Sequence, residues 1–293
     1  MSNEVWTPLK LVEWTAKHFA GKEIPQPRLE AELLLAHVLD WQRIDLYTRF
    51  EHVLAQNDLA RFRELVKRRA QRVPRQYLTR SDEFYGLKLT LDERVLIPRN
   101  ETEHLVEQAL ALLDESQHAN VVELCTGSAA VAVALAANRQ SLQIHACDIS
   151  QDALDVARIN IDAFGLGQRI ALHQGDLFEA LPETLKGTLD LILANPPYVR
   201  DDEWDHLPPE VVHEPRSALL AGPTGLEIIE RIIQQAPDWL KPNGHLLAEI
   251  GFGQARAVSE LASSTQDYGS PTLVRDLGKI QRIIVLNRED SHG

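Results

Sequence analysis

The segment 191–198, Leu-Ile-Leu-Ala-Asn-Pro-Pro-Tyr, is the part of the chain that decides its organisation. The apolar run 189–194 is typical of a buried strand. That strand must end at Asn195, because Pro196 and Pro197 have no backbone N–H to donate to a sheet. Asn195 and the carbonyl that follows it then form two rigidly held acceptors beside the ring of Tyr198. Such a pair suits a planar NH₂ group, and a plain strand followed by a proline turn is the alternative.

The composition is that of an ordinary globular protein, with 44% hydrophobic and 25% charged residues in 293, enough for two domains. No apolar run approaches the roughly 18 residues of a membrane helix. The first residues also lack the features of a signal peptide, so we expect a cytoplasmic protein with no membrane partner. A net charge of −13 argues against a broad contact with nucleic-acid phosphates, so no direct nucleic-acid partner is expected.

Several classes of chemistry are disfavoured by what the sequence contains. Cys125 and Cys147 are too few for a disulfide framework and lack metal-ligand spacing, so no metal is expected. The sequence has no Gly-Lys-Ser/Thr phosphate-binding loop, which argues against a nucleoside triphosphatase. A nicotinamide enzyme would leave the Asn-Pro-Pro-Tyr segment unexplained.

Residues 1–80 are expected to form a helical domain. Apolar stripes predict helices over about 9–21 and 29–38, a short helix near Asp45, and a further helix capped by Asp58. The end of this last helix carries a dense basic cluster, which consists of Lys67, Arg68, Arg69, Arg72 and Arg75. The cluster is interpreted either as a solvated helix end or as a contact for an acidic partner or RNA.

Residues 81–100 are expected to link this domain to a second one, 101–293. Two alternating runs, 84–91 and 94–97, flank a polar pair and predict a β-hairpin. After it, Asn100 or Thr102 is expected to cap a helix over 103–113.

Strand and helix patterns alternate from residue 120 onward. The expected strands are 121–124, 142–146, 170–173, 189–194, 245–250, 272–275 and 280–285, and the expected helices are 129–137, 151–164, 226–240 and 255–261. This alternation predicts an α/β fold, a Rossmann-like, doubly wound sheet of seven mostly parallel strands. The last two strands have no helix between them and must therefore run antiparallel.

Ligands of such sheets bind beyond the carboxyl ends of the strands. The small-residue turn 125–129 lies at one of these ends and allows a ligand to approach the backbone closely. Asp148 ends the next strand, about 20 residues further on, where an acid can hold ribose hydroxyls. Asp176 could accept from an exocyclic amine such as that of adenine, and Glu249 ends a further strand. Together they predict a site for an adenosine-bearing ligand, although any one acid alone is more often a helix cap.

Four segments together resemble the protein-glutamine N5-methyltransferases over nearly the whole chain. They are Ile-Pro-Arg-Asn-Glu-Thr-Glu at 97–103, Glu-Leu-Cys-Thr-Gly-Ser at 123–128, Asn-Pro-Pro-Tyr at 195–198 and His-Glu-Pro at 213–215. These enzymes are class I S-adenosylmethionine-dependent methyltransferases that modify the Gly-Gly-Gln loop of peptide chain release factors. A sister branch modifies a large-subunit ribosomal protein. The resemblance implies S-adenosylmethionine as cofactor, one of these proteins as partner, and a helical front domain that docks it.

The resemblance also implies roles for single residues. Asn195 and the Pro196 carbonyl would bind the glutamine amide, Tyr198 would pack against it, and Pro197 completes this catalytic set. The implied cofactor-binding residues are Glu123, Cys125, Thr126, Gly127, Ser128, Ala129, Asp148, Asp176, Leu177 and Asn195. Two of these depart from the family, because Cys125 and Ala129 stand where glycine is usual. The methyl group of Ala129 could crowd the carboxylate of the cofactor.

Two other interpretations stay open at this point. An adenine N6-methyltransferase of nucleic acids uses the same tetrapeptide on a flipped base, but the net acidity and the lack of a separate large target-reading domain argue against it. A non-catalytic binding module that has lost its cofactor is the second alternative, because the cofactor loop is altered at two positions.

Overall fold

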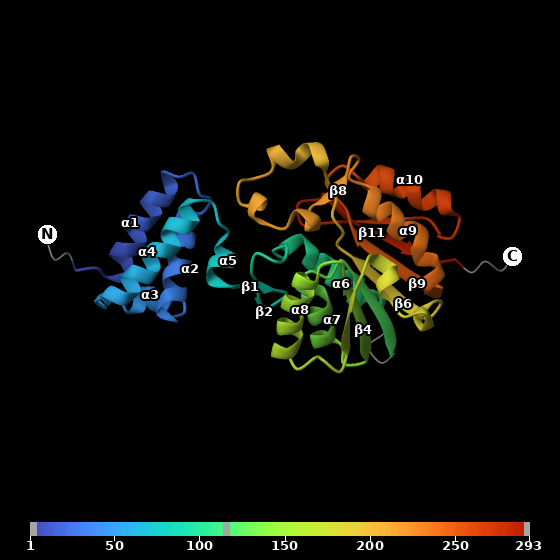
Figure 1. The fold of residues 1–293 in the computed structure, drawn as a ribbon, viewed down its shortest axis with the longest axis horizontal. Helices are drawn as coiled ribbons and strands as arrows, with labels where there is room; N and C mark the ends of the chain where they lie inside the picture. Colours follow the sequence, from blue (N-terminus) through green and yellow to red (C-terminus); the bar gives the residue numbers. More distant parts are fainter. Residues whose placement is uncertain (1–4, 114–117, 290–293) are drawn as a thin grey trace. The chain divides into compact units, whose positions relative to one another are not determined.

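The computed structural model describes residues 5–113 and 118–289, and it divides into two compact units (Figure 1). The first unit runs to Ser81 and includes the segment Pro208–His213. The second unit holds the remainder of the chain. The predicted domain boundaries at residues 80 and 100 stay a prediction. In the described part of the chain, no helix is both long enough and apolar enough to cross a membrane.

The first unit is helical, as expected. Its helices are α1 (Pro8–Ala20), α2 (Pro27–Leu39), α3 (Asp45–Thr48), α4 (Gln56–Ala70) and α5 (Arg75–Thr79). Their apolar faces meet in one core around Phe19, Leu34 and Phe62, which are almost fully buried. The predicted cap at Asp58 is wrong, because α4 begins two residues earlier at Gln56. Asp58 instead lies in the first turn, where the helix dipole favours a carboxylate.

The basic cluster turns partly inward. Arg69 is only 4% exposed; its Nε lies 2.5 Å from Glu30, and its guanidinium lies 3.1 Å from Glu210. Arg72 shares Glu210 at 3.1 Å, and Arg75 lies 3.5 Å from Glu30. Both interpretations of the cluster are therefore wrong for these three arginines, which use their charge inside the unit because buried charges need partners.

The β-hairpin forms with a different turn from the one predicted. Its strands are β1 (Ser81–Phe84) and β2 (Leu87–Thr90). Tyr85 and Gly86 connect them, and both have positive φ, 51° and 72°, as a two-residue type I′ turn requires. The predicted turn at 92–93 is wrong, because Asp92 accepts instead from the backbone N–H and the guanidinium of Arg94. A short polar pair formed a local side-chain turn rather than a hairpin.

The second unit contains a seven-stranded sheet of order β10-β11-β9-β6-β3-β4-β5. The strands are β3 (Ala119–Leu124), β4 (Leu142–Asp148), β5 (Ile170–Gln174), β6 (Leu189–Ala194), β9 (Leu240–Glu249), β10 (Thr272–Arg275) and β11 (Gln281–Asn287). Only the pairs β10–β11 and β11–β9 are antiparallel within this sheet. The predicted fold class, including the reversed final hairpin, is confirmed.

Strand β9 begins five residues earlier than predicted. Pro242 and Gly244 lie between the predicted helix 226–240 and the predicted strand 245–250, and β9 includes both of them. The pairing with β6 is irregular here, because Leu189 faces Leu240 but Leu191 faces His245. A bulge of this kind accepts proline and glycine at the start of a strand.

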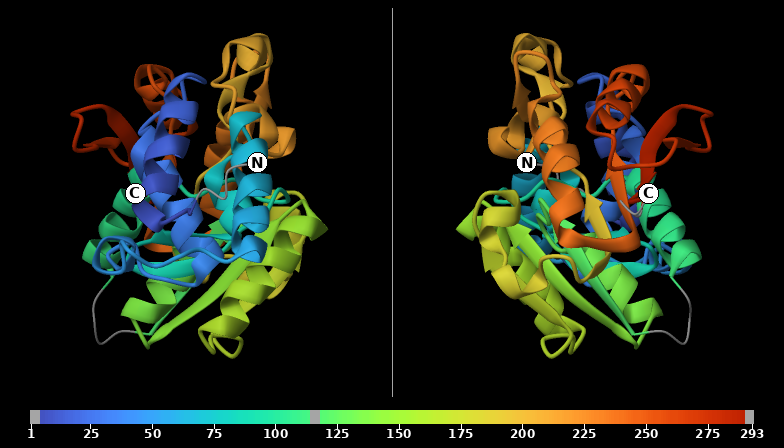
Figure 2. Two further views of the ribbon diagram at one scale, coloured as in Figure 1. Left: turned by 90° about the vertical axis from the view of Figure 1, so that its left-hand side faces the viewer. Right: turned by 90° about the vertical axis from the view of Figure 1, so that its right-hand side faces the viewer.

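Helices cover both faces of the sheet (Figures 1 and 2). They are α6 (Glu103–Leu112), α7 (Ala130–Asn138), α8 (Gln151–Ala163), α9 (Glu227–Trp239) and α10 (Ala255–Thr265). Short elements complete the unit: η1 (Asn100–Thr102), η2 (Leu177–Ala180), η3 (Glu183–Leu185), β7 (Val199–Arg200), η4 (Asp201–His206), η6 (Arg216–Ala218) and β8 (Leu220–Gly222). A further turn, η5 (Val211–His213), belongs to the first unit.

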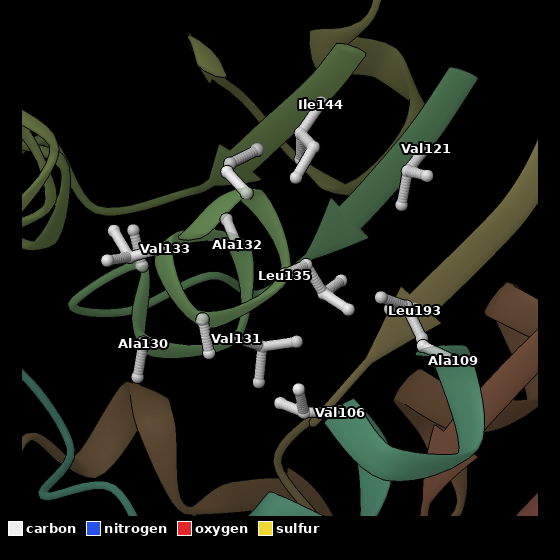
Figure 3. Close-up of a cluster of buried hydrophobic side chains, with 14 of the residues drawn as sticks. Val106, Ala109, Val121, Ala130, Val131, Ala132, Val133, Leu135, Ile144 and Leu193 are labelled. Atoms are coloured by element: carbon white, nitrogen blue, oxygen red, sulfur yellow. The ribbon is translucent and has the colours of Figure 1, made fainter. Parts of the chain in front are cut away.

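Alternate residues of the central strands enter two separate cores. On β3, Val121 packs with α6, α7 and α8, whereas Val122 packs with α9 and α10. Figure 3 shows the first core, in which Val121 and Leu193 face Leu135 of α7. Helix α7 is rich in alanine and buried along nearly its whole length, so its backbone can lie close to the sheet. This close packing places its amino terminus at the carboxyl edge of β3.

We expect Leu135→Ala to lower the free energy of unfolding of the second unit by about 2–5 kcal/mol, because it removes a fully buried side chain and leaves a cavity. Urea denaturation measures this loss. Leu277→Ala is the matched control, since Leu277 is 93% exposed and its truncation should have little effect. An equal loss in both variants would show that the core does not depend on α7.

Candidate functional site

A cavity of about 310 Å³ lies at the carboxyl ends of the central strands of the second unit. Seven of the predicted site residues line it, from the ends of β3, β4, β5 and β6: Cys125, Gly127, Asp148, Asp176, Leu177, Asn195 and Pro197. Residues that the sequence had not singled out also line it, among them Arg94 and Arg231. The structure therefore brings together side chains that are far apart in the chain, at the edge where the parallel strands end.

The six other predicted residues do not line this cavity, and one of them, Pro196, is buried. Glu123, Thr126, Ser128 and Ala129 are buried, and Ala129 packs into the core that contains α7. The methyl group of Ala129 thus belongs to the core and does not line the cavity, and the expected crowding of the cofactor carboxylate stays a prediction. Tyr198 lies at a neighbouring cavity of about 620 Å³, together with Gln254 and Arg282.

The turn after β3 is built from backbone that most residues avoid. Cys125, Gly127 and Ala129 have φ values of 55°, 55° and 60°. Glycine adopts this left-handed conformation without steric cost, whereas the other two residues need support from their surroundings. The backbone N–H of Thr126 provides part of it by donating to the carbonyl of Cys147 on β4 at 3.0 Å.

A buried carboxylate ties this turn to α7. Glu123 Oε2 accepts from the hydroxyl of Thr126 at 2.7 Å and from the backbone N–H of Ala132 at 3.0 Å. Burial raises the pKa of Glu123 to about 8. Glu123 thus stabilises the conformation of the turn. It does not line the cavity.

Asn160 of α8 supports the same turn from the other side. Its amide donates to the carbonyls of Ser128 at 2.9 Å and Thr90 at 3.1 Å, and its oxygen accepts from the N–H of Thr90 at 2.7 Å. No sequence pattern indicates this role, because Asn160 is one of several polar positions in a predicted helix.

Asp148 combines a backbone role with a position in the cavity. Its Oδ2 accepts from the N–H of Gly127 at 2.9 Å, and its Oδ1 accepts from the N–H of Ser150 at 3.0 Å. Burial raises the pKa of Asp148, and the two backbone hydrogen bonds oppose this shift. A carboxylate fixed in this way, at the end of β4, can accept hydrogen bonds from a pair of ligand hydroxyls.

Asp176 is paired with an arginine that the sequence had not indicated. Arg231 of α9 lies 2.8 Å from Asp176 Oδ2, and both side chains are more than one third exposed. The ion pair engages one carboxylate oxygen of Asp176. The second oxygen is the one that can meet an amine of a ligand.

Asn195 is held by a chain of two hydrogen bonds. Its Nδ2 donates to the hydroxyl oxygen of Thr102 at 3.2 Å, and that hydroxyl donates to Glu249 Oε2 at 2.7 Å. Thr102 occupies the N-cap position of α6, which is one of the two predicted alternatives, but its side chain makes no capping hydrogen bond. Asn100 begins η1, and the side chain of Thr102 is used by Glu249 instead of by the amino terminus of α6.

Hydrogen bonds also hold the carboxyl end of the tetrapeptide 195–198, Asn-Pro-Pro-Tyr, in place. Gln254 donates to the carbonyls of Tyr198 at 3.1 Å and Gly225 at 3.0 Å, and it accepts from the N–H of Gly251 at 2.7 Å. Gly225 has a φ of 77°, and a Cβ there would lie 2.7 Å from the carbonyl of Tyr198. Glycine is thus needed for this close approach.

Two of the remaining motif segments meet each other. Glu214 accepts from the backbone N–H of Ile97 at 3.1 Å and from the guanidinium of Arg99 at 2.6 Å. The Ile-Pro-Arg and Glu-Pro segments, more than a hundred residues apart, thus form one supporting contact in the second unit. His213 belongs to the first unit, where its ring lies 3.3 Å from the carbonyl of Gln71.

The thiols beside the cavity are not set up as nucleophiles. Cys125 and Cys147 are both free, and burial raises the pKa of Cys147 to about 12. Burial raises the pKa of Cys125 as well. A thiol that keeps its proton is a weak nucleophile.

Two family models match the chain, one on each side of the hairpin. Residues 10–79 match the PrmC N-terminal domain, and residues 102–251 match the Methyltransferase small domain. The second match spans about half of the chain.

Relatives of known name match nearly the full length. A release factor glutamine methyltransferase of Rhodopirellula baltica is 40% identical over 97% of both chains. One of Chlorobaculum tepidum is 39% identical over 95% of this chain and 96% of its own. Among solved structures, a methyltransferase from Pyrococcus furiosus is similar with a TM-score of 0.52 and 16% identity, over 80% of this chain and all of that one. This last likeness concerns the fold alone.

The buried Glu123 predicts a pH-dependent stability. Because its pKa is about 8 in the folded chain and near 4.5 as a free group, the folded state keeps a proton that the unfolded state has lost. Its contribution to the free energy of unfolding must therefore fall as the pH rises through this window. Urea denaturation at several pH values measures this decrease of the free energy of unfolding with pH. We expect the decrease to be smaller in Glu123→Gln and unchanged in Glu260→Gln, which lies at an exposed site. Parallel curves for wild type and Glu123→Gln would contradict the assignment.

Proposed function

Because the chain belongs to the family of release factor glutamine methyltransferases, we propose that it methylates the side-chain amide N5 of a glutamine in a peptide chain release factor, in the Gly-Gly-Gln loop. The methyl donor in this proposal is S-adenosylmethionine. Two relatives that match almost end to end bear this enzyme name, which supports the release factor over a ribosomal protein. Since release factors act on ribosomes, we place the reaction in the cytoplasm.

The cavity fits the methyl donor in its chemistry. Its volume of about 310 Å³ lies at the lower end of the range for ligand pockets. Asp148 would hold the ribose hydroxyls, Asp176 would accept from the adenine amine, and the backbone around Gly127 would face the methionine end. When bound, the donor supplies an electrophilic methyl group on a sulfonium.

The tetrapeptide would bind and orient the glutamine amide. Asn195 Oδ1 and the Pro196 carbonyl can each accept one of the two hydrogens of the amide NH₂. This directs the nitrogen lone pair, which is otherwise delocalised into the amide carbonyl, toward the methyl carbon. Holding two reactants in line can supply on the order of 7–11 kcal/mol at best.

The same acceptors stabilise the charge that develops during transfer. Formation of the bond between the amide nitrogen and the methyl carbon would break the carbon–sulfur bond of the donor, and the electron pair of that bond would remain on sulfur. The nitrogen becomes positive and then releases one proton to water. Acceptors aimed at this charge act most strongly in a site that excludes water.

Tyr198 contributes an aromatic wall rather than a base. Burial raises the pKa of Tyr198 to about 12, so its phenol stays neutral near pH 7. The ring can pack against the planar amide, while Gln254 holds the backbone of Tyr198 in place.

A single observation carries the proposal. Asn195 lines the same cavity as Asp148 and Asp176, and its amide nitrogen is committed to Thr102. The carboxamide oxygen is therefore the atom of Asn195 that can serve a substrate NH₂.

We expect Asn195→Ala to reduce methyl transfer to a release factor by at least about 100-fold, the usual scale for loss of one preorganised group that stabilises a transition state. Its affinity for S-adenosylmethionine should change little. Transfer of a labelled methyl group and calorimetry measure the two effects, with Asn138→Ala, at the exposed end of α7, as control. Turnover near that of wild type in Asn195→Ala would disprove the role of Asn195.

The acceptor is identified by offering the wild-type chain a release factor, a large-subunit ribosomal protein fraction and DNA in parallel. Mass spectrometry should find one added methyl group on a release factor glutamine. Methylation of ribosomal protein or of adenine alone would overturn the proposed substrate.

For the donor, we expect Asp148→Asn to weaken binding of S-adenosylmethionine by about tenfold to a hundredfold, since a hydrogen bond to a charged group contributes about 1.5–3 kcal/mol. Calorimetry on the purified chain tests this. Asp238→Asn is the matched control, because Asp238 is exposed near the end of α9. Unchanged affinity in Asp148→Asn would remove Asp148 from the donor site.

A further inference from the structure

We propose that Glu249, acting through Thr102, determines which end of the Asn195 carboxamide faces the substrate, and is therefore a positioning residue for methyl transfer. This inference rests on the proposed function, because it concerns the acceptor that Asn195 presents to the glutamine.

Three elements meet at this point. Thr102 ends η1, Asn195 follows β6, and Glu249 ends β9, which is the neighbour of β6 in the sheet. The bonds are 3.2 Å from Asn195 Nδ2 to Thr102 Oγ1 and 2.7 Å from Thr102 Oγ1 to Glu249 Oε2. Thr102 is 4% exposed and Glu249 is 3% exposed, so water does not substitute for either partner.

The direction of the chain follows from the chemistry of its members. A carboxylate can only accept hydrogen bonds, so the single hydroxyl proton of Thr102 must point to Glu249. The oxygen of Thr102 then has lone pairs only for its other neighbour, and it must accept from the NH₂ of Asn195. Asn195 is thereby oriented with its nitrogen toward Thr102 and its oxygen away from it. A substrate NH₂ needs this oxygen, since it donates and does not accept.

Protonation of Glu249 would remove this constraint. A carboxylic acid donates its own proton, so the hydroxyl of Thr102 would be released to donate to Asn195. The carboxamide would then turn over and present its NH₂ to the NH₂ of the substrate. Two donors cannot form the hydrogen bond that aligns the nucleophile.

The surroundings of Glu249 make this change accessible near neutral pH. Burial raises the pKa of Glu249 to about 7, and the Thr102 hydroxyl opposes that shift. The charged or titratable groups that face Glu249 are Arg282 of β11, Arg99 before η1, Glu101 within η1, and Tyr198 after β6. Both arginines are shared, Arg99 with Glu214 at 2.6 Å and Arg282 with Asp276 at 3.2 Å. On α6, Glu103 accepts from the N–H of Tyr85, and His104 lies 2.9 Å from Glu107.

Four proteins distinguish a positioning role of Thr102 and Glu249 from a purely structural role. They are the wild type and the variants Thr102→Val, Thr102→Ser and Glu249→Gln. Thr188→Val, at an exposed threonine, is the matched control. Single-turnover methyl transfer to a release factor is measured with saturating donor from about pH 5.5 to about pH 8.5, a span that brackets the pKa expected for Glu249. Calorimetry with S-adenosylmethionine and thermal unfolding are recorded for every chain.

The wild-type rate should fall about tenfold per pH unit below the pKa of Glu249. Thr102→Val should lose about 10- to 100-fold in rate at pH 8 without weaker donor binding, in keeping with the loss of one oriented hydrogen bond. Thr102→Ser should retain most of the rate, because it keeps the hydroxyl. In Glu249→Gln the rate should no longer fall at low pH, because an amide does not titrate. This variant tests the proposal even if Thr102→Val fails to fold.

The possible failures are distinguishable. If the wild-type chain transfers no methyl group to a release factor, the proposed function falls and this inference falls with it. If the wild type is active but Thr102→Val keeps its rate, or the rate of Glu249→Gln still falls at low pH, the positioning role is overturned and the function stands. Equal losses in Thr102→Ser and Thr102→Val would also overturn it, since they would indicate a packing role.

Discussion

Strand β6 ends because its backbone has no further donors, and the rest of the site depends on that end. Pro196 and Pro197 stop the pairing at Ala194, so the first side chain beyond the sheet is Asn195. Parallel pairing with β3, and through it with β4, brings the ends of all three strands to one edge. The turn around Gly127, the carboxylate of Asp148 and the amide of Asn195 are neighbours for this reason. The proposed sites for the methyl donor and the methyl acceptor therefore lie at one edge of the sheet.

The bonds that give these side chains their orientation come from segments distant in sequence. Thr102 and Glu249 lie 93 and 54 residues from Asn195, on opposite sides of it in the chain, and they fix its amide. Gln254 fixes the carbonyl of Tyr198, and Asn160 fixes the turn at Ser128. The groups expected to touch ligand are thus few, while a larger set of buried polar groups determines how they point. Such networks are stabilising only when every member is satisfied.

The fold and the position of the site could be predicted because both follow from local rules. Alternation of apolar strands and helices predicts the sheet, and strand ends predict where polar residues gather. The errors concern competition between partners. Thr102 has the residue type of a helix cap, but Glu249 accepts its hydroxyl proton. The alternating pattern predicts Asp92 in a hairpin turn, whereas Tyr85 and Gly86 adopt the left-handed backbone that the turn needs. Arg69 belongs to a basic run, yet two glutamates brought together by folding neutralise it. No local pattern records such partners.

Helix α7 has a consequence for how this enzyme can vary. Its residues are almost all alanine or valine, and seven of them are buried from Ala130 to Ala136. Small side chains set the spacing between the helix axis and the sheet, and the helix follows directly on the turn that carries Gly127. A bulkier residue anywhere on its buried side would push the whole helix outward and carry the turn away from Asp148. The shape of the cavity thus depends on core residues of α7 that do not line it.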